Sequence, residues 1–392
     1  MNTGKRTNRI IFSILAVVIG ILIVFLLSIA GEGSRGPMQS LLDNVAKSVQ
    51  ALEERMILQR RESKRSRKLT WFEPYVENID LLKDPEVILL GASDTYEKES
   101  FESIIDLEDS LNTTFPLIHI YSAWGSKEEQ EFPELEVLTI LELGSLPVIT
   151  WEPWLTSFDP EEYPGIPPIE DRGRGCLRAI AEGTYDKYII EWAGKVRETG
   201  SPIFVRLGHE MNDPYRYPWG PQNNKPKDFI DAWIHVHEIF QAENATNVLW
   251  VWSPHPSYGY FDAYYPGKDY VDYIGSGILN FGNVASWSKW WTFDEIFGKA
   301  YPALDTFEKP MMITEFGSLN VGGDRSEWFK ESFKNLPELY PSIKSLVFFH
   351  YSEDRTVTNK VVSWEIIHDP ASIQAIKEQI MTWPDSIRPP DR

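Results

Sequence analysis

Eight short apolar runs recur through the last three quarters of the chain, and helix-like or irregular segments separate them. Short apolar runs bounded by turn residues are typical of buried strands, and their alternation with helical segments indicates a parallel sheet with helical crossovers. Eight such units within about 300 residues predict an α/β protein built as a (β/α)8 TIM barrel. The runs are residues 87–90, 117–121, 148–151, 203–207, 248–252, 273–275, 311–314 and 345–350.

An open, doubly wound sheet is the alternative arrangement of alternating strands and helices. Such sheets, when they bind nucleotides, carry a G-x-G-x-x-G turn after the first strand. The sequence that follows the first run, Gly91-Ala92-Ser93, lacks this pattern, so the barrel is favoured. Helices are predicted between the runs, among them residues 185–199, 227–242 and 325–335.

The N-terminus combines basic residues with a long apolar run. Lys5, Arg6 and Arg9 precede an apolar run at residues 10–30, and ~20 apolar residues are enough to cross a bilayer. Basic residues before such a run favour a cytoplasmic N-terminus. We therefore predict a cytoplasmic tail (1–9), a transmembrane signal-anchor and an extracytoplasmic remainder, either periplasmic or at the cell surface. Cleavage after the apolar run, which would give a secreted protein, and a buried helix of a soluble protein are the alternatives.

Residues 31–84 are predicted to be a helical stem or linker, and residues 85–392 the barrel domain. Apolar residues recur in the stem at a/d-like spacing, namely Leu42, Val45, Val49, Leu52 and Met56. One amphipathic helix fits this spacing, and a short coiled coil giving weak dimerisation is the alternative. The basic run at residues 60–68 is expected to be a solvated face, with a contact to lipid head groups as the second interpretation.

Composition excludes several classes of function. The formal net charge is −20, which argues against a nucleic-acid partner, because such binding relies on Lys and Arg neutralising phosphates. Cys176 is the only cysteine, so no internal disulfide can form. His209-Glu210 has Asp213 where a zinc-protease helix would have its second histidine, so no metal site is predicted from this motif.

Two of the apolar runs stop at a glutamate. Glu210 follows the run at residues 203–207, and Glu315 follows the run at residues 311–314. Parallel barrel strands end on one rim, so these side chains are expected to face each other. Hydrolysis of a glycosidic bond with retention needs two carboxyl groups about 5–5.5 Å apart, one acidic and one nucleophilic.

The two carboxyl groups need opposite environments. Apolar neighbours and a nearby negative charge raise the pKa of the acid, whereas hydrogen-bond donors keep the nucleophile ionised. Arg206, which we expect to point into the barrel from the strand before Glu210, is the candidate donor. An ordinary ion pair inside the barrel is the alternative role for Arg206.

Further polar and aromatic residues follow the ends of the runs and are candidates for substrate binding. Structural roles are the alternative for each: a satisfied histidine, a hydrogen-bonding carboxylate or a tryptophan of the core. The candidates are His209, Arg206, Trp151, Glu152, Trp154, Asn212, Trp219, Trp252, Tyr351 and Trp364.

An ordered set of motifs resembles glycoside hydrolase family 26, the β-mannanase family of retaining barrel enzymes, over roughly residues 85–375. It includes P-V-I-T-W-E-P-W at 147–154, R-L-G-H-E-M-N at 206–212, Y-P-W-G at 217–220, N-V-L-W-V-W-S-P at 247–254, Y-P-G at 265–267, F-D-E-I-F-G at 293–298 and K-P-M-M-I-T-E-F-G-S at 309–318. The resemblance implies that Glu210 is the acid/base and Glu315 the nucleophile. It also implies that His209 lies near the nucleophile or the sugar, and that Trp364 forms the floor beneath the cleaved sugar.

The resemblance further implies an endo-acting hydrolase of a β-linked polysaccharide that needs no cofactor or metal. The substrate would be β-mannan, the usual substrate of the family, or a mixed-linkage β-glucan, and a xylanase is a third interpretation. The chain departs from the family pattern V-G-x-D-G-Y-N, because Gly277 replaces the aspartate and Leu279 the tyrosine that hydrogen-bonds the nucleophile.

The loss of that tyrosine leaves three outcomes open: another substrate, a replacement donor such as Tyr351, or weak catalysis. It also motivates a second hypothesis of another class. The barrel would then be a polysaccharide-binding or processing module, tethered at the membrane beside an exopolysaccharide synthesis and export system.

Overall fold

The computed structural model describes residues 65, 67–94, 101–285, 287–355 and 360–390. They all belong to one compact unit, Arg61–Arg392. The predicted tail, signal-anchor and a/d-like seam lie outside the described residues. Within the described ranges, every helix is too short or too polar to cross a membrane.

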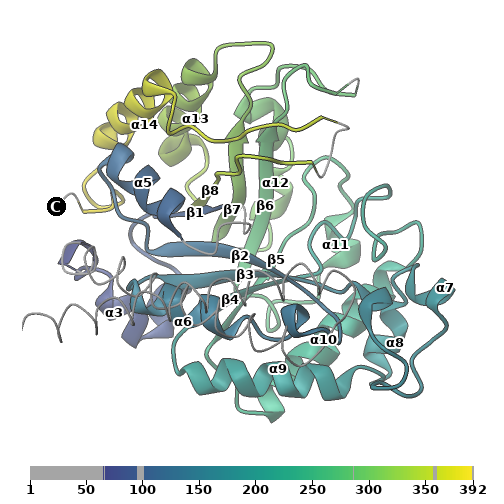
Figure 1. The fold of residues 1–392 in the computed structure, drawn as a ribbon. Helices are drawn as coiled ribbons and strands as arrows, with labels where there is room; N and C mark the ends of the chain where they lie inside the picture. The colour runs from purple at the N-terminus through teal and green to yellow at the C-terminus, as the bar shows by residue number, and fades with distance from the viewer. Residues whose placement is uncertain (1–64, 66, 95–100, 286, 356–359, 391–392) are drawn as a thin grey trace, which may run out of the picture. The chain divides into compact units, whose positions relative to one another are not determined.

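The unit is a closed barrel of eight parallel strands, in which each strand pairs with the next and β8 pairs with β1 (Figure 1). This confirms the predicted barrel, and each predicted run coincides with a strand. The strands are β1 (Leu89–Ser93), β2 (Leu117–Ala123), β3 (Leu146–Glu152), β4 (Ile203–Leu207), β5 (Val248–Trp252), β6 (Tyr273–Asn280), β7 (Met311–Ser318) and β8 (Ile343–Phe349).

Helices connect the strands and pack on the outside of the barrel, as the predicted crossovers require. The longer ones are α5 (Glu102–Leu111), α6 (Glu134–Glu142), α9 (Asp186–Thr199), α10 (Pro226–Ala242), α13 (Arg325–Leu339) and α14 (Pro370–Thr382). The shorter ones are α3 (Glu73–Glu77), α4 (Ile79–Leu82), α7 (Ile169–Arg172), α8 (Leu177–Ala181), α11 (Phe261–Tyr264) and α12 (Tyr301–Asp305). Single turns lie at η2 (Glu128–Gln130), η3 (Leu155–Ser157) and η4 (Asp294–Gly298).

The N-terminal ends of the strands are closed by residues that precede β1. Leu69, Phe72 and Leu82 are buried in one apolar cluster with the first inward-facing residues of the strands. The Tyr273 hydroxyl donates a hydrogen bond to the Leu82 carbonyl oxygen and fixes α4 beneath the barrel. Residues 67–84, which the sequence analysis grouped with the stem, therefore contribute side chains to the core of the barrel.

The expectation of a solvated basic face is wrong for Arg65. Its guanidinium is buried and forms an ion pair of 2.8 Å with Glu108 of α5. It also donates to the Phe115 and Leu143 carbonyl oxygens and to the Ser145 hydroxyl. A buried charge is tolerated here because its donors find partners.

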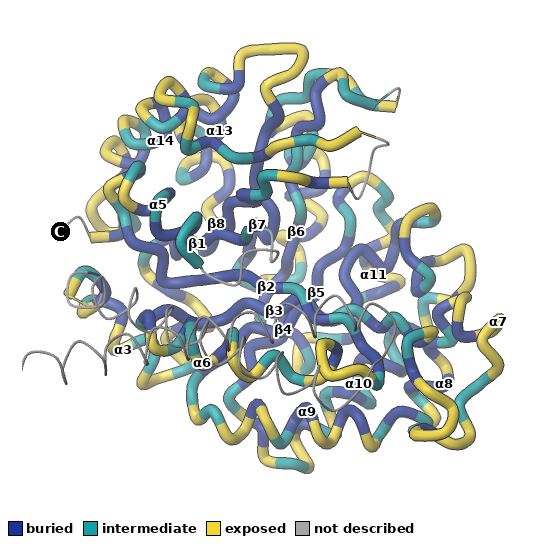
Figure 2. The backbone as a smooth tube through the Cα atoms, in the orientation of Figure 1, coloured by how far each residue is buried: buried dark blue, intermediate teal, exposed yellow. Residues whose placement is uncertain are grey.

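The barrel interior changes character along the strands, most of whose residues are buried (Figure 2). Side chains two positions apart share a face, so on β2 Leu117, His119 and Tyr121 all point inward. The first of these lies in the apolar cluster, whereas the other two make polar contacts across the barrel. The same change occurs on β3 between Val148 and Thr150. Polar chemistry is thus confined to the C-terminal half of the interior.

Candidate active site

The two predicted glutamates lie on the same rim of the barrel. Glu315 is in β7, and Glu210 follows β4 in the left-handed backbone region with φ 53°. A methyl group placed on Gly277 of β6 would lie 3.5 Å from Glu315 Oε2 and 3.7 Å from Glu210 Oε1. The two oxygens are therefore separated by at most the sum of these distances, 7.2 Å. Both carboxylates thus border one gap, which the glycine leaves open.

Glu315 is held by two donors. Arg206 Nη1 lies 2.5 Å from Glu315 Oε1, and the Tyr121 hydroxyl donates to the same oxygen at 2.9 Å. Burial alone would raise the pKa of Glu315, but the charge and hydrogen bond of Arg206 outweigh it and lower the pKa below its ordinary value. Glu315 is therefore ionised, as a carboxylate nucleophile must be.

Arg206 is itself oriented by neighbouring strands. Its Nε donates to the Ser253 hydroxyl at 2.9 Å, and its Nη1 donates to the Thr150 hydroxyl at 3.3 Å. His119 Nε2 lies 2.7 Å from the same Thr150 oxygen. Burial, and then the charge of Arg206, lower the pKa of His119 to about 3, so that this histidine is neutral. The inward-pointing role predicted for Arg206 agrees with this geometry, which keeps the guanidinium beneath the gap.

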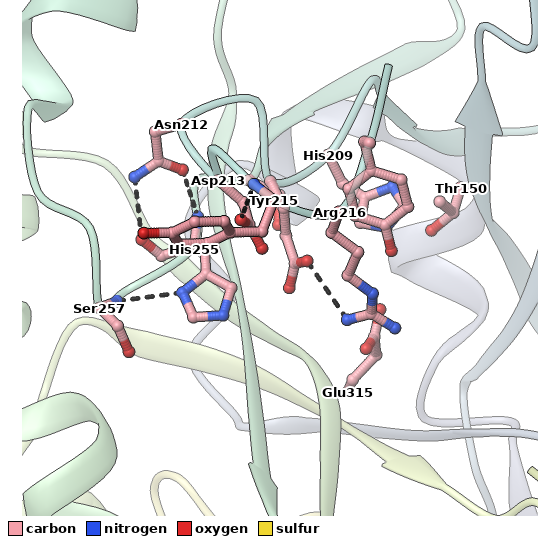
Figure 3. Close-up of polar contacts among 12 residues, drawn as sticks. Thr150, His209, Asn212, Asp213, Tyr215, Arg216, His255, Ser257 and Glu315 are labelled. Carbon is pink, nitrogen blue, oxygen red and sulfur yellow. Dashed lines mark hydrogen bonds and ion pairs between the residues drawn. The ribbon is translucent and has the colours of Figure 1, made fainter. Parts of the chain in front are cut away.

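A second guanidinium lies above the gap. Arg216 Nη1 is 3.5 Å from Glu210 Oε2, and the side chain is 31% exposed. Its guanidinium also lies over the Tyr217 ring at 5.3 Å. Figure 3 shows this side chain extending toward Glu315. The loop after β4 therefore supplies both a carboxylate and a cation to the site.

His209 is part of a chain of buried contacts beside the gap. Its Nε2 lies 2.8 Å from the Tyr217 hydroxyl, and its Nδ1 lies 3.9 Å from Glu152 Oε1. Burial and the charge of Arg206 lower its pKa well below the ordinary value, so that the ring is neutral. The structure thus places His209 against Tyr217 and Glu152, and no hydrogen bond links it to Glu315 among the described residues.

Trp219 and Trp154 support this chain. The Trp219 ring stacks on Tyr217 at 4.6 Å, and its Nε1 donates to the His209 carbonyl oxygen at 2.8 Å. Trp154 Nε1 donates to Glu152 Oε2 at 3.0 Å. Burial raises the pKa of Glu152 to about 7, against the opposing effects of this hydrogen bond and of Arg206. Trp219 is fully buried and therefore supports Tyr217 from behind.

Two predicted substrate contacts, Trp151 and Trp252, are wrong. Each lies one position from an inward-facing residue, so it points outward between the barrel and its helices. Trp151 stacks on Trp192 of α9 at 4.2 Å. Trp252 packs against Tyr265 at 5.2 Å, and both tryptophans are completely buried. They belong to the core.

Asn212 also has a role different from the predicted contact with substrate. Its Nδ2 donates to the carbonyl oxygens of His255 and Gly259, each at 3.0 Å, and its Oδ1 accepts from the His255 backbone N–H at 2.7 Å. Because these contacts use both N–H groups of the amide, Asn212 clamps the β5 loop to the β4 loop and has no donor left for a sugar.

Tyr351 and Trp364 lie together on the β8 side of the site. Tyr351 stacks on Phe349 at 4.1 Å and meets the edge of the Tyr121 ring at 6.4 Å. Trp364 is buried in a cluster with Phe281, and its Nε1 donates to Asp354 Oδ2 at 2.9 Å. The replacement donor to Glu315 is thus Tyr121 from β2, and Tyr351 lies behind it.

Sequence reasoning missed Tyr121, Thr150 and Arg216, and did not assign Ser253 a role. The alternation of inward and outward positions carries the signal for three of them, because each lies an even number of positions after an inward-facing apolar residue of the same strand. Arg216 lies in a loop, where no such periodicity applies.

One group of side chains among the described residues could hold a metal ion. Glu210, Asp213 and His255 each offer a ligand atom, and these atoms lie within 4.8 Å of one another. The His255 Nδ1 atom already accepts a hydrogen bond from the Ser257 backbone N–H at 3.1 Å (Figure 3). A metal ion bound at Nδ1 would therefore have to displace the Ser257 N–H from that nitrogen.

Retaining glycoside hydrolases built on (β/α)8 barrels have two carboxyl groups on the C-terminal rim, one of which is kept ionised. The site described above, in which Arg206 keeps Glu315 ionised, has this arrangement. The sequence model of Glycosyl hydrolase family 26 matches residues 178–317, which include both glutamates. Endoglucanase H of Acetivibrio thermocellus is 31% identical over 290 residues, covering 72% of this chain and 29% of that protein. The chain belongs to glycoside hydrolase family 26.

Other similar proteins agree with this assignment. A mannan endo-1,4-beta-mannosidase of Bacillus subtilis is 21% identical over 189 residues, covering 46% of this chain and 47% of that protein. The chain thus spans less than half the length of these curated relatives. A family 26 protein from a Muricauda species has the same fold, with a TM-score of 0.55 and 17% identity over 81% of this chain and 93% of that one. The Bacillus subtilis mannanase man26 matches with a TM-score of 0.51 and 16% identity over 78% and 91%.

Proposed function

We propose that this chain is a retaining endo-β-glycanase that hydrolyses a β-linked polysaccharide by double displacement. Glu315 attacks the anomeric carbon while Glu210 gives its proton to the departing glycosidic oxygen, forming a covalent glycosyl-enzyme. Glu210 then removes a proton from water, and the hydroxyl displaces Glu315 from the sugar. The observation that carries this proposal is the opposed pair of carboxylates, with Arg206 and Tyr121 both donating to Glu315.

The separation of the carboxyl groups supports the retaining course. The upper limit of 7.2 Å, the sum of the 3.5 and 3.7 Å distances to a carbon on Gly277, leaves room for the 5–5.5 Å typical of retaining enzymes. For this pair of oxygens, the limit reaches only the lower end of the roughly 6.5–9.5 Å range in which inverting enzymes hold a water molecule.

The Tyr121 hydrogen bond supports an enzyme over a binding module. Leu279 lies in an apolar cluster with Phe281 and Trp364 and offers no donor. Tyr121, from the opposite side of the barrel, supplies the hydroxyl that Leu279 cannot. A module selected only for binding would have no need to keep two donors on a buried carboxylate.

For the substrate we propose a β-glucan, with β-mannan as the second candidate. The endoglucanase is 31% identical to this chain, whereas the mannosidases are 21–22% identical over shorter stretches. The family's mannan-degrading members are the reason to keep the second candidate. We also propose that the enzyme acts outside the cytoplasm, tethered by residues 10–30, because of their apolar sequence.

The test is release of reducing ends from mixed-linkage β-glucan, β-mannan, xylan, curdlan and cellulose by the purified chain. Activity is expected on a β-glucan, and Glu315→Ala should abolish it. Activity on β-mannan alone would contradict the β-glucan proposal and make β-mannan the substrate. Binding to a glycan without turnover, by the wild type under all conditions, would favour the binding module.

A further inference from the structure

Three polar side chains lie in a row from the end of β3 to the loop after β4, beside the two carboxylates. His209 Nε2 lies 2.8 Å from the Tyr217 hydroxyl oxygen, and His209 Nδ1 lies 3.9 Å from Glu152 Oε1. We call Glu152, His209 and Tyr217 the Glu–His–Tyr chain. Glu152 belongs to the inner face of β3, because it lies two positions after Thr150, whose hydroxyl contacts Arg206 inside the barrel.

The middle of the Glu–His–Tyr chain is open. His209 Nδ1 is buried and has no hydrogen-bond partner among the described residues, although buried polar atoms nearly always have one. Glu152 Oε1 faces it, while the hydrogen bond from Trp154 Nε1 goes to the other carboxyl oxygen, Oε2. The separation of 3.9 Å exceeds a hydrogen bond by about 1 Å. Rotation of the Glu152 carboxyl group can close it, because this last torsion of a glutamate is soft.

The closed contact can form in two ways, because His209 is neutral. Burial and the charge of Arg206 lower the pKa of His209 well below its ordinary value, so the ring carries one hydrogen, on either Nδ1 or Nε2. A protonated Glu152 donates to Nδ1, which places the ring hydrogen on Nε2, where it points to the Tyr217 oxygen. An ionised Glu152 accepts from Nδ1–H, and Nε2 then accepts from the Tyr217 hydroxyl.

Glu152 is poised to change its proton near neutral pH. Burial raises the pKa of Glu152 to about 7, against the opposing effects of the Trp154 hydrogen bond and the charge of Arg206. The other charged or titratable groups that face it from neighbouring elements are Glu315 on β7, His209, Arg216 and Tyr217 after β4, and Tyr351 after β8.

Tyr217 connects the chain to the general acid. Burial, and then the charge of Glu210, raise the pKa of the Tyr217 hydroxyl well above its ordinary value, so the hydroxyl keeps its hydrogen and acts as a donor. Stacking on Trp219 at 4.6 Å and the Arg216 guanidinium at 5.3 Å fix the ring. The direction of the hydroxyl hydrogen therefore depends on which nitrogen of His209 already carries one.

We propose that Glu152 is a positioning residue whose proton selects the hydrogen-bearing nitrogen of His209, and thereby directs the Tyr217 hydroxyl hydrogen either toward Glu210 or back to His209. The inference rests on the proposed function, because Glu210, as the acid, becomes negative when it gives its proton to the glycosidic oxygen. A hydroxyl aimed at Glu210 stabilises that charge.

The change between the two states releases one proton to solvent. The hydrogen on His209 Nε2 leaves, the Glu152 hydrogen passes to Nδ1, and the Tyr217 hydroxyl turns to donate to Nε2. The state with the protonated Glu152 is therefore the one that supports Glu210, and it prevails below about pH 7.

Nitrogen NMR of His209 tests the proposal without turnover. The full chain contains seven histidines, and nitrogen-15 labelling shows which nitrogen of each ring carries a hydrogen; His209→Gln assigns the signal. The hydrogen of His209 should lie on Nε2 at low pH and on Nδ1 at high pH, with a midpoint at about pH 7. His119 is the internal control and should keep one arrangement, because it is neutral and its partner Thr150 does not titrate.

Variants of Glu152 assign the change to its carboxyl group. Glu152→Met and Glu152→Gln cannot ionise, so the hydrogen of His209 should stay on one nitrogen across the same pH range in both. Glu170→Gln, at an exposed position of α7, should behave as the wild type. A hydrogen of His209 that stays on one nitrogen in the wild type, or that moves equally in the Glu152 variants, would overturn the proposal.

The pH profile of polysaccharide cleavage links the chain to catalysis. Redirection of the Tyr217 hydrogen should lower kcat about tenfold as the pH rises through neutrality, because a hydrogen bond to a charged group is lost. Tyr217→Phe keeps the stacked ring and should show the lower kcat on both sides of this range. A wild-type profile in both Tyr217→Phe and Glu152→Met would reject the link. An inactive wild type would contradict the proposed function, and the NMR measurement would still decide the role of Glu152.

Discussion

The two halves of the barrel interior are made by the same strands but have opposite chemistry. Toward the N-terminal ends, Leu117, Val148 and Phe204 pack with α3 and α4 in one apolar cluster. Two positions further along the same strands, His119, Thr150 and Arg206 form a hydrogen-bonded network that ends on Glu315. The change falls at different register positions in neighbouring strands, because the polar His119 of β2 pairs with the apolar Val148 of β3.

This division separates stability from chemistry. The apolar half removes surface from water and should account for most of the interior's contribution to folding. The polar half buries ionised groups, which costs desolvation that is offset only while every partner is present. Substitutions in the apolar half should therefore change the free energy of unfolding and leave turnover unchanged. Substitutions in the polar half should change turnover, and should change stability only through the charges that are buried there.

Glu210→Ala should give the largest effect, and only on turnover. Without a general acid, kcat on the polysaccharide should fall about 10³-fold or more. The matching glycosyl fluoride needs no proton to leave. Added azide, an anionic nucleophile that replaces the base-activated water in the second step, should therefore restore its turnover as the glycosyl azide forms and Glu315 is released. An equal loss on the fluoride that azide does not relieve would contradict the acid/base role.

Arg65→Met tests stability at a buried ion pair away from the site, between the segment before β1 and α5. Removing one partner of the buried pair leaves Glu108 with an unpaired charge, so the free energy of unfolding should fall by about 3–5 kcal/mol. Chemical denaturation measures this loss, and kcat per folded molecule should be unchanged. Arg178→Met, which breaks an exposed pair with Glu182, is the control and should leave the midpoint where it is.

Glu152→Gln tests how much a buried charge destabilises the polar half of the barrel. Burial raises the pKa of Glu152 in the folded protein to about 7, so the folded state binds its proton more tightly than the unfolded chain does. Stability should therefore fall as the pH rises from about 4.5 to 7, by about 3 kcal/mol in total. The glutamine variant should be the more stable protein at pH 8 and should lose this advantage at pH 4.

The measurement is the denaturation midpoint as a function of pH. Glu170→Gln, at an exposed position of α7, provides the matched control. An advantage for Glu152→Gln that grew at low pH would reverse the sign of the argument.

Tyr121→Phe should give the smallest of these effects. Loss of one preorganised donor to Glu315 should lower kcat about 10²-fold while the fold stays intact. Tyr351→Phe removes the neighbouring hydroxyl and serves as the control, with near wild-type kcat expected. A larger loss of kcat in Tyr351→Phe than in Tyr121→Phe would show that Tyr351, and not Tyr121, is the donor to Glu315.

The sequence predicted the barrel well because every strand, buried on both faces, is a nearly continuous apolar run. The same continuity hid the direction of each side chain. Trp151 and Trp252 were assigned to the cleft because they end such runs, yet both lie at outward positions of the two-residue alternation.

The candidate site was predictable at the strand ends and not in the loops. Glu210, Glu315 and Arg206 follow from the pattern of the runs. The left-handed backbone at Glu210, the clamp made by Asn212 and the reach of Arg216 depend on contacts between loops distant in sequence. The burial of Leu69, Phe72 and Leu82 was missed for a related reason, since short helices beneath a barrel carry no extended periodic pattern.

The most direct test of the account is covalent trapping of the nucleophile. A 2-deoxy-2-fluoro glycosyl fluoride of the sugar cleaved in the substrate screen forms a glycosyl-enzyme that hydrolyses slowly, and peptide mass spectrometry then locates the attachment. The account predicts one label per chain, on Glu315. A label on Glu152, Glu210 or any other residue, or turnover without any trapped intermediate, would contradict it.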